Sequence, residues 1–154
     1  MEKYRIIDNA IPEELANELE ELLSNPWFPW YISRSGYTSD KESYEKELMN
    51  HPNIIEYLQF VHTFHTDDGE PGNQSSYLGK SLEILEYLGR VIGHKQFLLT
   101  RCKANLQTKL LNFEEDNYNT PHVDRTEEHL VLLYYVNDSD GDTFLFDDQN
   151  EIIT

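Results

Sequence analysis

The chain has 154 residues, of which 38% are hydrophobic and 12% aromatic; this is enough for one globular core and excludes a disordered composition. Its 29 acidic residues outnumber its 12 basic ones, and the formal net charge of -17 argues against nucleic acid and anionic membranes as partners. The N-terminus lacks a signal-peptide layout and no run approaches the ~20 apolar residues of a membrane span, so we expect a soluble, cytoplasmic protein.

The first helix is predicted after Ile11-Pro12, because proline suits a first helical turn and the glutamates that follow suit the positive end of the helix dipole. Asn25-Pro26 ends this helix. Residues 4–7 before it are expected to form a short strand, and residues 27–39 after it a strand with a loop. The apolar positions of the helix recur at helical spacing: Leu15, Leu19, Leu22 and Leu23.

Two further helices are predicted before residue 94. The second covers residues 43–65 and is strongest over 53–62, and a loop rich in Gly, Pro, Asp, Asn and Ser follows at 66–76. The third covers residues 77–94, with Gly93 as its C-terminal cap. Its predicted apolar face consists of Leu82, Leu85, Leu88 and Val91.

After residue 94 the pattern changes to that of strands. Strands are predicted over residues 96–110, 129–137, 143–148 and 151–154, joined by turns. Helices first and strands afterwards indicate one α+β domain over residues 1–154, with helical support at about 1–94 and an antiparallel, jelly-roll-type β core at about 95–154. The single cysteine, Cys102, lies in the first of these strands, where we expect a buried and inert thiol.

The sequence "PHVD" places His122 and Asp124 one residue apart, just before an apolar run. On a strand, residues i and i+2 point to the same face, so an imidazole and a carboxylate could bind one ion. With a second histidine they would complete the two-histidine, one-carboxylate set of non-heme Fe(II) oxygenases. The triplet alone is weak, because a surface histidine beside a solvated aspartate has the same pattern.

Its context resembles a known family. "PHVD", then "LVLLYYVN", then "DGDTFLF", is similar to the first half of the double-stranded β-helix of 2-oxoglutarate and Fe(II)-dependent dioxygenases, prolyl-4-hydroxylase-like branch. The family pattern is H-x-D, a strand ending in Tyr-Leu-Asn, then Gly-Gly-x-Thr-x-Phe. Gly141 and Thr143 match it, whereas Asp142 replaces the second glycine. The preceding "RCKANL" also resembles the strand before H-x-D, so the resemblance covers residues ~95 to 154.

This resemblance implies a role for each matching residue. His122 and Asp124 would be two of three iron ligands, with 2-oxoglutarate as co-substrate and ascorbate as a possible reductant. Tyr135 would hydrogen-bond the distal carboxylate of 2-oxoglutarate, although alternation along the strand leaves Tyr134 as the other choice. Asn105 is a weaker candidate for polar contact with the co-substrate. The hydroxylation substrate is not defined by the sequence, and a peptidyl proline is possible by analogy only.

The second half of the family's site is not found in these residues. The family places its second histidine several strands after H-x-D, with a basic residue following it. Here His129 is the one histidine after Asp124 and lies too close, and no Lys or Arg follows Arg125. We therefore expect a truncated domain that binds Fe(II) weakly and does not turn over 2-oxoglutarate. Its half-built sheet would leave apolar edges exposed and could form a homo-oligomer.

The remaining histidines have plainer interpretations. His62 and His65 lie three residues apart on a possible helix end, and solvated or capping roles are favoured for them because no third ligand stands at metal spacing. His51 and His94 flank helices and are interpreted as caps or surface residues. The alternative to an oxygenase is a non-enzymatic β-sandwich that serves as an interaction module through its strand edges.

Overall fold

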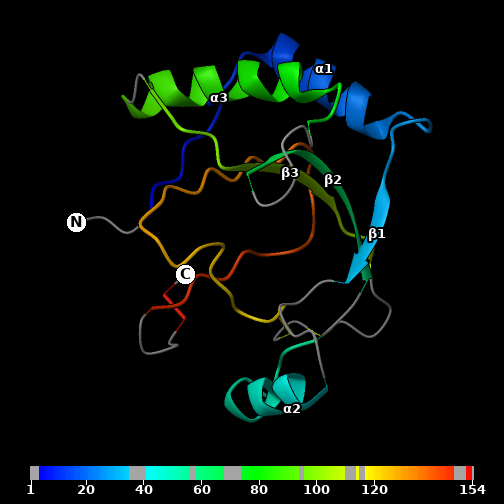
Figure 1. Cartoon of the computed structure of the whole chain (residues 1–154), viewed down its shortest axis with the longest axis vertical. Coiled ribbons are helices and arrows are strands. Elements are labelled where there is room, and N and C mark those ends of the chain that lie inside the picture. Colours follow the sequence, from blue (N-terminus) through cyan, green and yellow to red (C-terminus); the bar gives the residue numbers. More distant parts are fainter. Residues whose placement is uncertain are drawn as a thin grey trace. The chain divides into compact units, whose positions relative to one another are not determined.

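A computed structural model gives the fold of the chain, and it describes residues 4–34, 41–55, 58–67, 74–93, 96–109, 114, 117–147 and 152–153. Helices and strands alternate along the chain (Figure 1). Among the described residues, no helix is long and apolar enough to cross a bilayer. The elements in chain order are α1 (Glu13–Ser24), β1 (Tyr31–Arg34), α2 (Lys41–Asn50), β2 (Leu58–Thr66), α3 (Leu78–Ile92) and β3 (Arg101–Leu106).

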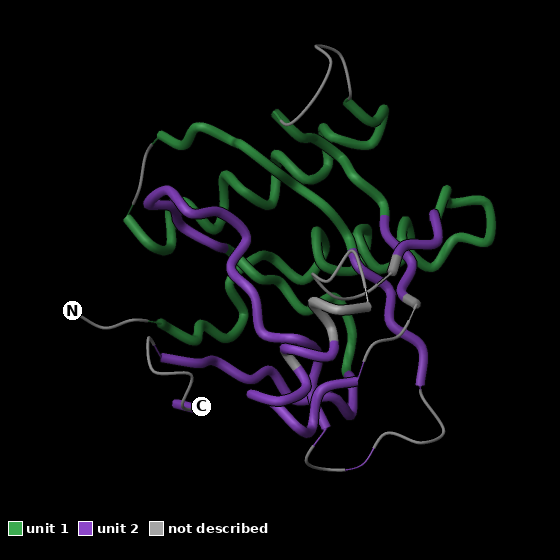
Figure 2. The backbone as a smooth tube through the Cα atoms, turned by 60° about the horizontal axis from the view of Figure 1, so that its bottom comes forward, with its two compact units in different colours: residues 1–30, 62–104, 132–138 green, residues 31–61, 105–131, 139–154 purple. Residues whose placement is uncertain are grey.

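The chain folds into two compact units that interleave along the sequence (Figure 2). Unit 1 contains residues 1–30, 62–104 and 132–138, and unit 2 contains residues 31–61, 105–131 and 139–154. Each unit is therefore built from segments far apart in the sequence. The predicted single domain, with its division near residue 94, stays a prediction.

The three strands form one small sheet in the order β1-β2-β3. β1 pairs with β2 in antiparallel fashion, with Tyr31 opposite Val61 and Ser33 opposite Gln59. A mixture of helices with a small antiparallel sheet confirms the predicted α+β class at this level. The finer prediction, a double-stranded β-helix, stays a prediction.

Helix α1 forms where it was predicted and packs through its predicted face. Leu15 and Leu19 are buried, and the first turn carries Glu13 and Glu14, whose charge suits the helix N-terminus. The C-cap residue Asn25 has an extended backbone (φ -64, ψ 128), because the proline that follows disfavours a helical conformation there.

Helix α3 also forms as predicted and ends at Gly93, whose left-handed backbone (φ 79) suits a residue without a side chain. Its predicted buried face is partly wrong. Ile84 is buried and Leu88 packs with it, whereas Leu82 and Val91 are 42% and 39% exposed. The apolar residues of α3 cover one broad face, so their spacing alone did not define which part of that face meets α1.

The core of unit 1 lies between α1 and α3, which run side by side (Figure 1). Its buried members are Ile11, Leu15, Leu19 and Ile84. Tyr134 and Val136 pack against this core from the segment at 132–138. Between them Tyr135 is 56% exposed, as expected where alternate side chains of an extended segment face opposite sides.

The second predicted helix is wrong in its strongest part. Its beginning overlaps α2, but residues 58–66 form strand β2 instead. Along β2, His62 and Phe64 are buried and Thr63 is exposed, which is the period of a strand. β2 lies between β1 and β3 and bonds to both, so sheet pairing outweighs the helical spacing of its apolar residues.

Several predicted strands are shorter or unformed. Within the described residues 96–109 the strand is β3 alone, and residues 4–7 form no strand. Residues 129–137 and 143–147 show one isolated bridge among the described residues, between Phe146 and Ile152. A strand is stable only when a neighbouring backbone accepts and donates its hydrogen bonds, and no such ladder is present for these segments among the described residues. Residues 68–73 of the predicted loop at 66–76, and residues 151 and 154 of the last predicted strand, lie outside the described residues.

Candidate functional site

His122 and Asp124 lie together in unit 2, on irregular backbone rather than on the predicted strand. The His122 Nε2 atom is 4.0 Å from the Asp124 Oδ1 atom. Their side chains are 45% and 31% exposed, so an ion from solvent can reach both. The two side chains therefore converge, as the H-x-D spacing predicted, although a bend at Asp124 and not a strand brings them together.

The ring of His122 is oriented by the backbone. Its Nδ1 atom lies 3.0 Å from the carbonyl oxygen of Thr120, which accepts a hydrogen bond from Nδ1–H. In a neutral imidazole this leaves the lone pair on Nε2, the nitrogen that faces Asp124. Histidine ligands of metals are commonly held in this way, by a carbonyl on the other ring nitrogen.

The pair fits part of a metal site. Ligand bonds of ~2.0–2.2 Å from nitrogen and oxygen allow two donors to share one ion up to about 4.2 Å apart, so the observed 4.0 Å suffices at a wide angle. An angle of 90° would bring the two atoms to ~3.0 Å, which small side-chain rotations can supply. Among the described residues no group of three His, Cys, Asp or Glu side chains gathers as a metal-ligand set. The pair thus offers two ligands.

The two predicted co-substrate residues are both exposed. Tyr135 belongs to unit 1 and points away from its core, whereas the neighbouring Tyr134 packs on the core, and burial followed by the nearby Glu20 carboxylate raises the pKa of Tyr134. Of the two tyrosines, Tyr135 is therefore the more exposed. Asn105 is exposed near the end of β3. Contact of either residue with a co-substrate stays a prediction.

His62 was predicted to be solvated or capping, and this is wrong. It is 4% exposed, its Nδ1–H donates to the Pro29 carbonyl at 2.9 Å, and its Nε2 accepts from the Ser75 hydroxyl at 2.7 Å. Its ring packs on the aromatic rings of Phe28 and Phe64, with centroids 4.6 and 4.8 Å away. Aromatic residues two positions before and after His62 were the sequence signal for a buried strand position.

His51 is also buried, at 5% exposure, and the prediction of a cap or surface residue is wrong for it. Its Nδ1 shares a hydrogen bond of 3.3 Å with the Tyr118 hydroxyl, and its ring lies edge-on to Phe146. Burial raises the pKa of the Tyr118 phenol. His65 bonds through Nε2 to the Leu99 carbonyl at 3.1 Å, and His94 lies outside the described residues. These contacts join distant segments, which local sequence patterns do not reveal.

Cys102 is half-buried on β3, and burial raises the pKa of its thiol, an effect that a hydrogen bond from Ser81 opposes in part. A raised pKa lowers the thiolate fraction at neutral pH, and the thiolate is the reactive form. We expect iodoacetamide to alkylate the folded chain more slowly than the urea-unfolded chain at pH 8, with a difference that narrows as pH rises above the thiol pKa. Mass spectrometry measures the alkylation rates. Equal rates for the folded and the unfolded chain at pH 8 would contradict the raised pKa of the thiol.

Thr120 lies beside the candidate pair and is 3% exposed, and its Oγ1 atom has no hydrogen-bond partner among the described residues. A buried hydroxyl without a partner costs ~1–3 kcal/mol, so Thr120→Val should raise the free energy of unfolding by about 1 kcal/mol. Thr126→Val, at an exposed position of the same unit, should change it by less than ~0.5 kcal/mol. A loss of stability in Thr120→Val, measured by urea denaturation, would show that the hydroxyl holds a water or an ion.

No protein-family model matches the chain, and no curated protein or solved structure matches it either. The resemblance seen in the motifs therefore stays a prediction. Support for the candidate site therefore comes from the geometry of its own residues.

Proposed function

We propose that the chain is a non-heme Fe(II) and 2-oxoglutarate-dependent hydroxylase domain whose metal site includes His122 and Asp124. The observation that carries this proposal is the 4.0 Å approach of His122 Nε2 to Asp124 Oδ1, with the other ring nitrogen held by the Thr120 carbonyl. An oriented imidazole beside an anionic carboxylate is the ligand chemistry that such iron sites use. The order of motifs around this pair supports the same assignment.

Each residue has a defined task in this proposal. His122 offers its Nε2 lone pair, Asp124 offers a carboxylate oxygen and a negative charge, and the Thr120 carbonyl keeps the imidazole in the required tautomer. Fe(II), when bound with 2-oxoglutarate and dioxygen, would supply the oxidising chemistry that hydroxylates a C–H bond.

The proposal includes the finer fold. We infer that the extended segments 129–137 and 143–147 correspond to strands of a double-stranded β-helix. The alternation of half-buried and exposed residues from Val131 to Val136 supports this inference, because it has the period of a strand packed on one face.

Anaerobic equilibrium dialysis of Fe(II) tests the proposal. Because 2-oxoglutarate chelates iron through its 2-oxo and carboxylate groups, we expect it to raise Fe(II) binding by the 154-residue chain several-fold. Succinate, which lacks the 2-oxo group, should not raise it. His122→Ala should abolish the increase. If 2-oxoglutarate and succinate behave alike, the hydroxylase assignment is wrong and the pair is at most a simple cation site.

The same polypeptide should not release succinate steadily when it is incubated in air with Fe(II), ascorbate and 2-oxoglutarate. Two protein ligands leave the iron weakly held, and no third ligand group lies with them among the described residues. Removing one partner of a buried charged pair costs ~3–5 kcal/mol, so a co-substrate carboxylate without a buried cation loses two or more decades of affinity. Succinate above the iron-only background would show that the site is completed in another way.

An interaction module remains the second candidate, and one observation favours it. Leu133 and Tyr135 are 63% and 56% exposed on an extended segment, and exposed apolar strips of this kind mark interaction surfaces. The dialysis experiment separates the two candidates, because an interaction module has no reason to bind 2-oxoglutarate and Fe(II) together.

A further inference from the structure

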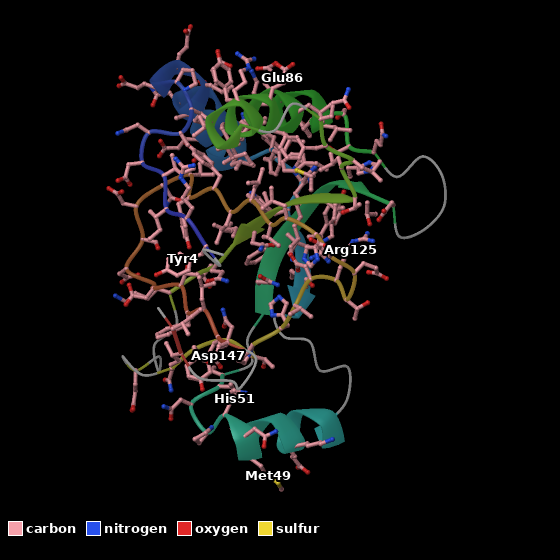
Figure 3. The ribbon with its side chains drawn as sticks, turned by 90° about the vertical axis from the view of Figure 1, so that its left-hand side faces the viewer. Tyr4, Met49, His51, Glu86, Arg125 and Asp147 are labelled. Carbon is pink, nitrogen blue, oxygen red and sulfur yellow. The ribbon has the colours of Figure 1, made fainter. Side chains whose placement is uncertain are left out.

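An exposed stretch, residues 137–142, connects two extended segments, and the second of these reaches Asp147 (Figure 3). The backbone bends at Asn137 and again at Asp140, and every residue of the stretch is exposed. The chain passes here from unit 1, which ends this run at residue 138, to unit 2. Within the stretch, Asp140 is followed by Gly141, a pair whose chemistry differs from that of the neighbouring aspartates.

An aspartate that precedes a glycine can rearrange its own backbone. The nitrogen of the glycine attacks the side-chain carboxyl carbon of the aspartate, a new C–N bond closes a five-membered succinimide, and a C–O bond breaks with loss of one water. Water then adds to either carbonyl of the ring and opens it. One opening restores aspartate, and the other gives isoaspartate, in which the backbone runs through the side-chain carboxyl. The reaction releases and consumes one water and needs no oxidant or reductant.

The backbone nitrogen of Gly141 is available for this attack. Among the described residues no backbone hydrogen bond holds it, because the stretch belongs to neither a helix nor a strand. Its N–H donates to the Ser139 hydroxyl at 3.4 Å, and that hydroxyl lies 3.5 Å from the Gly141 carbonyl oxygen. Both distances exceed the ~2.7–3.2 Å of well-formed hydrogen bonds, so these contacts restrain the glycine weakly.

The carboxyl group of Asp140 is equally accessible. Its side chain is 84% exposed, and its Oδ2 atom lies 3.4 Å from the Nζ atom of Lys109, whose side chain is 80% exposed. Exposed ion pairs of this kind hold their partners weakly, because water and salt screen the attraction. The Asp140 side chain can therefore rotate its carboxyl carbon toward the Gly141 nitrogen.

The same stretch contains two natural comparisons. Asp138 and Asp142 are also exposed. Ser139 and Thr143 follow them, and each carries a Cβ atom that hinders the approach of its own nitrogen to the preceding carboxyl group. Glycine lacks this atom and adopts more backbone conformations, including those that ring closure requires. Three aspartates in one environment therefore differ in the residue that follows each of them.

We propose that Asp140–Gly141 is a modification site at which the folded chain forms a succinimide and then isoaspartate. The succinimide removes one negative charge from the stretch, and isoaspartate restores that charge while adding one carbon atom to the backbone. The change falls where the chain passes between its two units. The proposal is independent of the iron site, because neither His122 nor Asp124 takes part in the reaction.

The test is to age the whole chain at 37 °C and neutral pH and to map its peptides by mass spectrometry. No Lys or Arg follows Arg125, so trypsin places residues 126–154 in one peptide, apart from the other Asp-Gly pair at 68–69, which lies outside the described residues. Asp-N protease cleaves before aspartate but not before isoaspartate. We expect loss of the cleavage before residue 140 alone, preceded by a form of the tryptic peptide lighter by one water.

Gly141→Ala is the matched variant. Gly141 does not have a left-handed backbone, and nothing lies within 4 Å of where its Cβ atom would stand, so alanine fits without strain. The variant should fold as the unaltered chain does, and its conversion at Asp140 should be several-fold slower. A synthetic peptide of residues 136–146 gives the rate for an unfolded chain, and the folded chain should convert at a similar rate.

Any of three results would overturn the proposal. The first is an unchanged Asp140 in the folded chain when the synthetic peptide has largely converted, because the fold then protects the pair. The second is equal conversion at Asp138, Asp140 and Asp142, because the glycine then has no influence. The third is equal conversion in the unaltered chain and in the Gly141→Ala variant.

Discussion

Phe28→Ala should lower the free energy of unfolding by about 3–5 kcal/mol, the cost of truncating a buried aromatic residue. Phe28 is 5% exposed in unit 1 and lies at the centre of an aromatic cluster. The ring centroids of His62, Trp30 and Tyr77 are 4.6, 5.0 and 5.2 Å from that of Phe28, and Phe64 is slightly farther. Alanine would leave a cavity between these rings, with the buried His62 on its wall.

The neighbouring residue supplies the control. Trp27 is 89% exposed, and the bond of its backbone N–H to the Asn25 side chain does not depend on its indole. Trp27→Ala should therefore change the free energy of unfolding by less than ~0.5 kcal/mol. Urea denaturation followed by far-UV circular dichroism measures both variants without relying on tryptophan fluorescence. If the two variants lose similar stability, the aromatic cluster is not a core.

His122→Ala should weaken binding of a divalent transition metal by at least ~10–100-fold. That factor is typical when a residue that only hydrogen-bonds a metal ligand is lost, and His122→Ala removes a ligand itself. Co(II) is a suitable probe, since nitrogen-containing sites bind it more tightly than Fe(II). Asp124→Asn should also weaken binding, because an amide lacks the charge that a metal ion requires. Isothermal titration with the whole chain measures these affinities.

His129→Ala is the matched control for that experiment. His129 lies in the same unit, and its Nδ1 donates to the Glu127 carbonyl at 2.7 Å, which repeats the local contact between His122 and Thr120. A loss of affinity limited to His122→Ala and Asp124→Asn would locate the metal at the candidate pair. No loss of affinity in any of the three variants would indicate that the acidic surface binds the metal instead.

Local sequence alone determined the two long helices and their ends. Pro12 and the glutamates after it begin α1, Asn25-Pro26 ends it, and Gly93 ends α3, because each acts through the backbone within one or two turns. The convergence of His122 and Asp124 is local too, since it depends on residues two apart and on the carbonyl of Thr120.

Tertiary structure alone decided the features that join distant segments. The apolar residues of β2 could suit a helix or a strand, and pairing with β1 and β3 selects the strand. His62 is buried because Pro29 and Ser75, far from it in the sequence, satisfy both of its ring nitrogens. Which part of the broad apolar face of α3 meets α1 likewise depends on long-range packing, because Ile84 is buried in the core with α1 whereas Leu82 and Val91 on the same helix stay exposed.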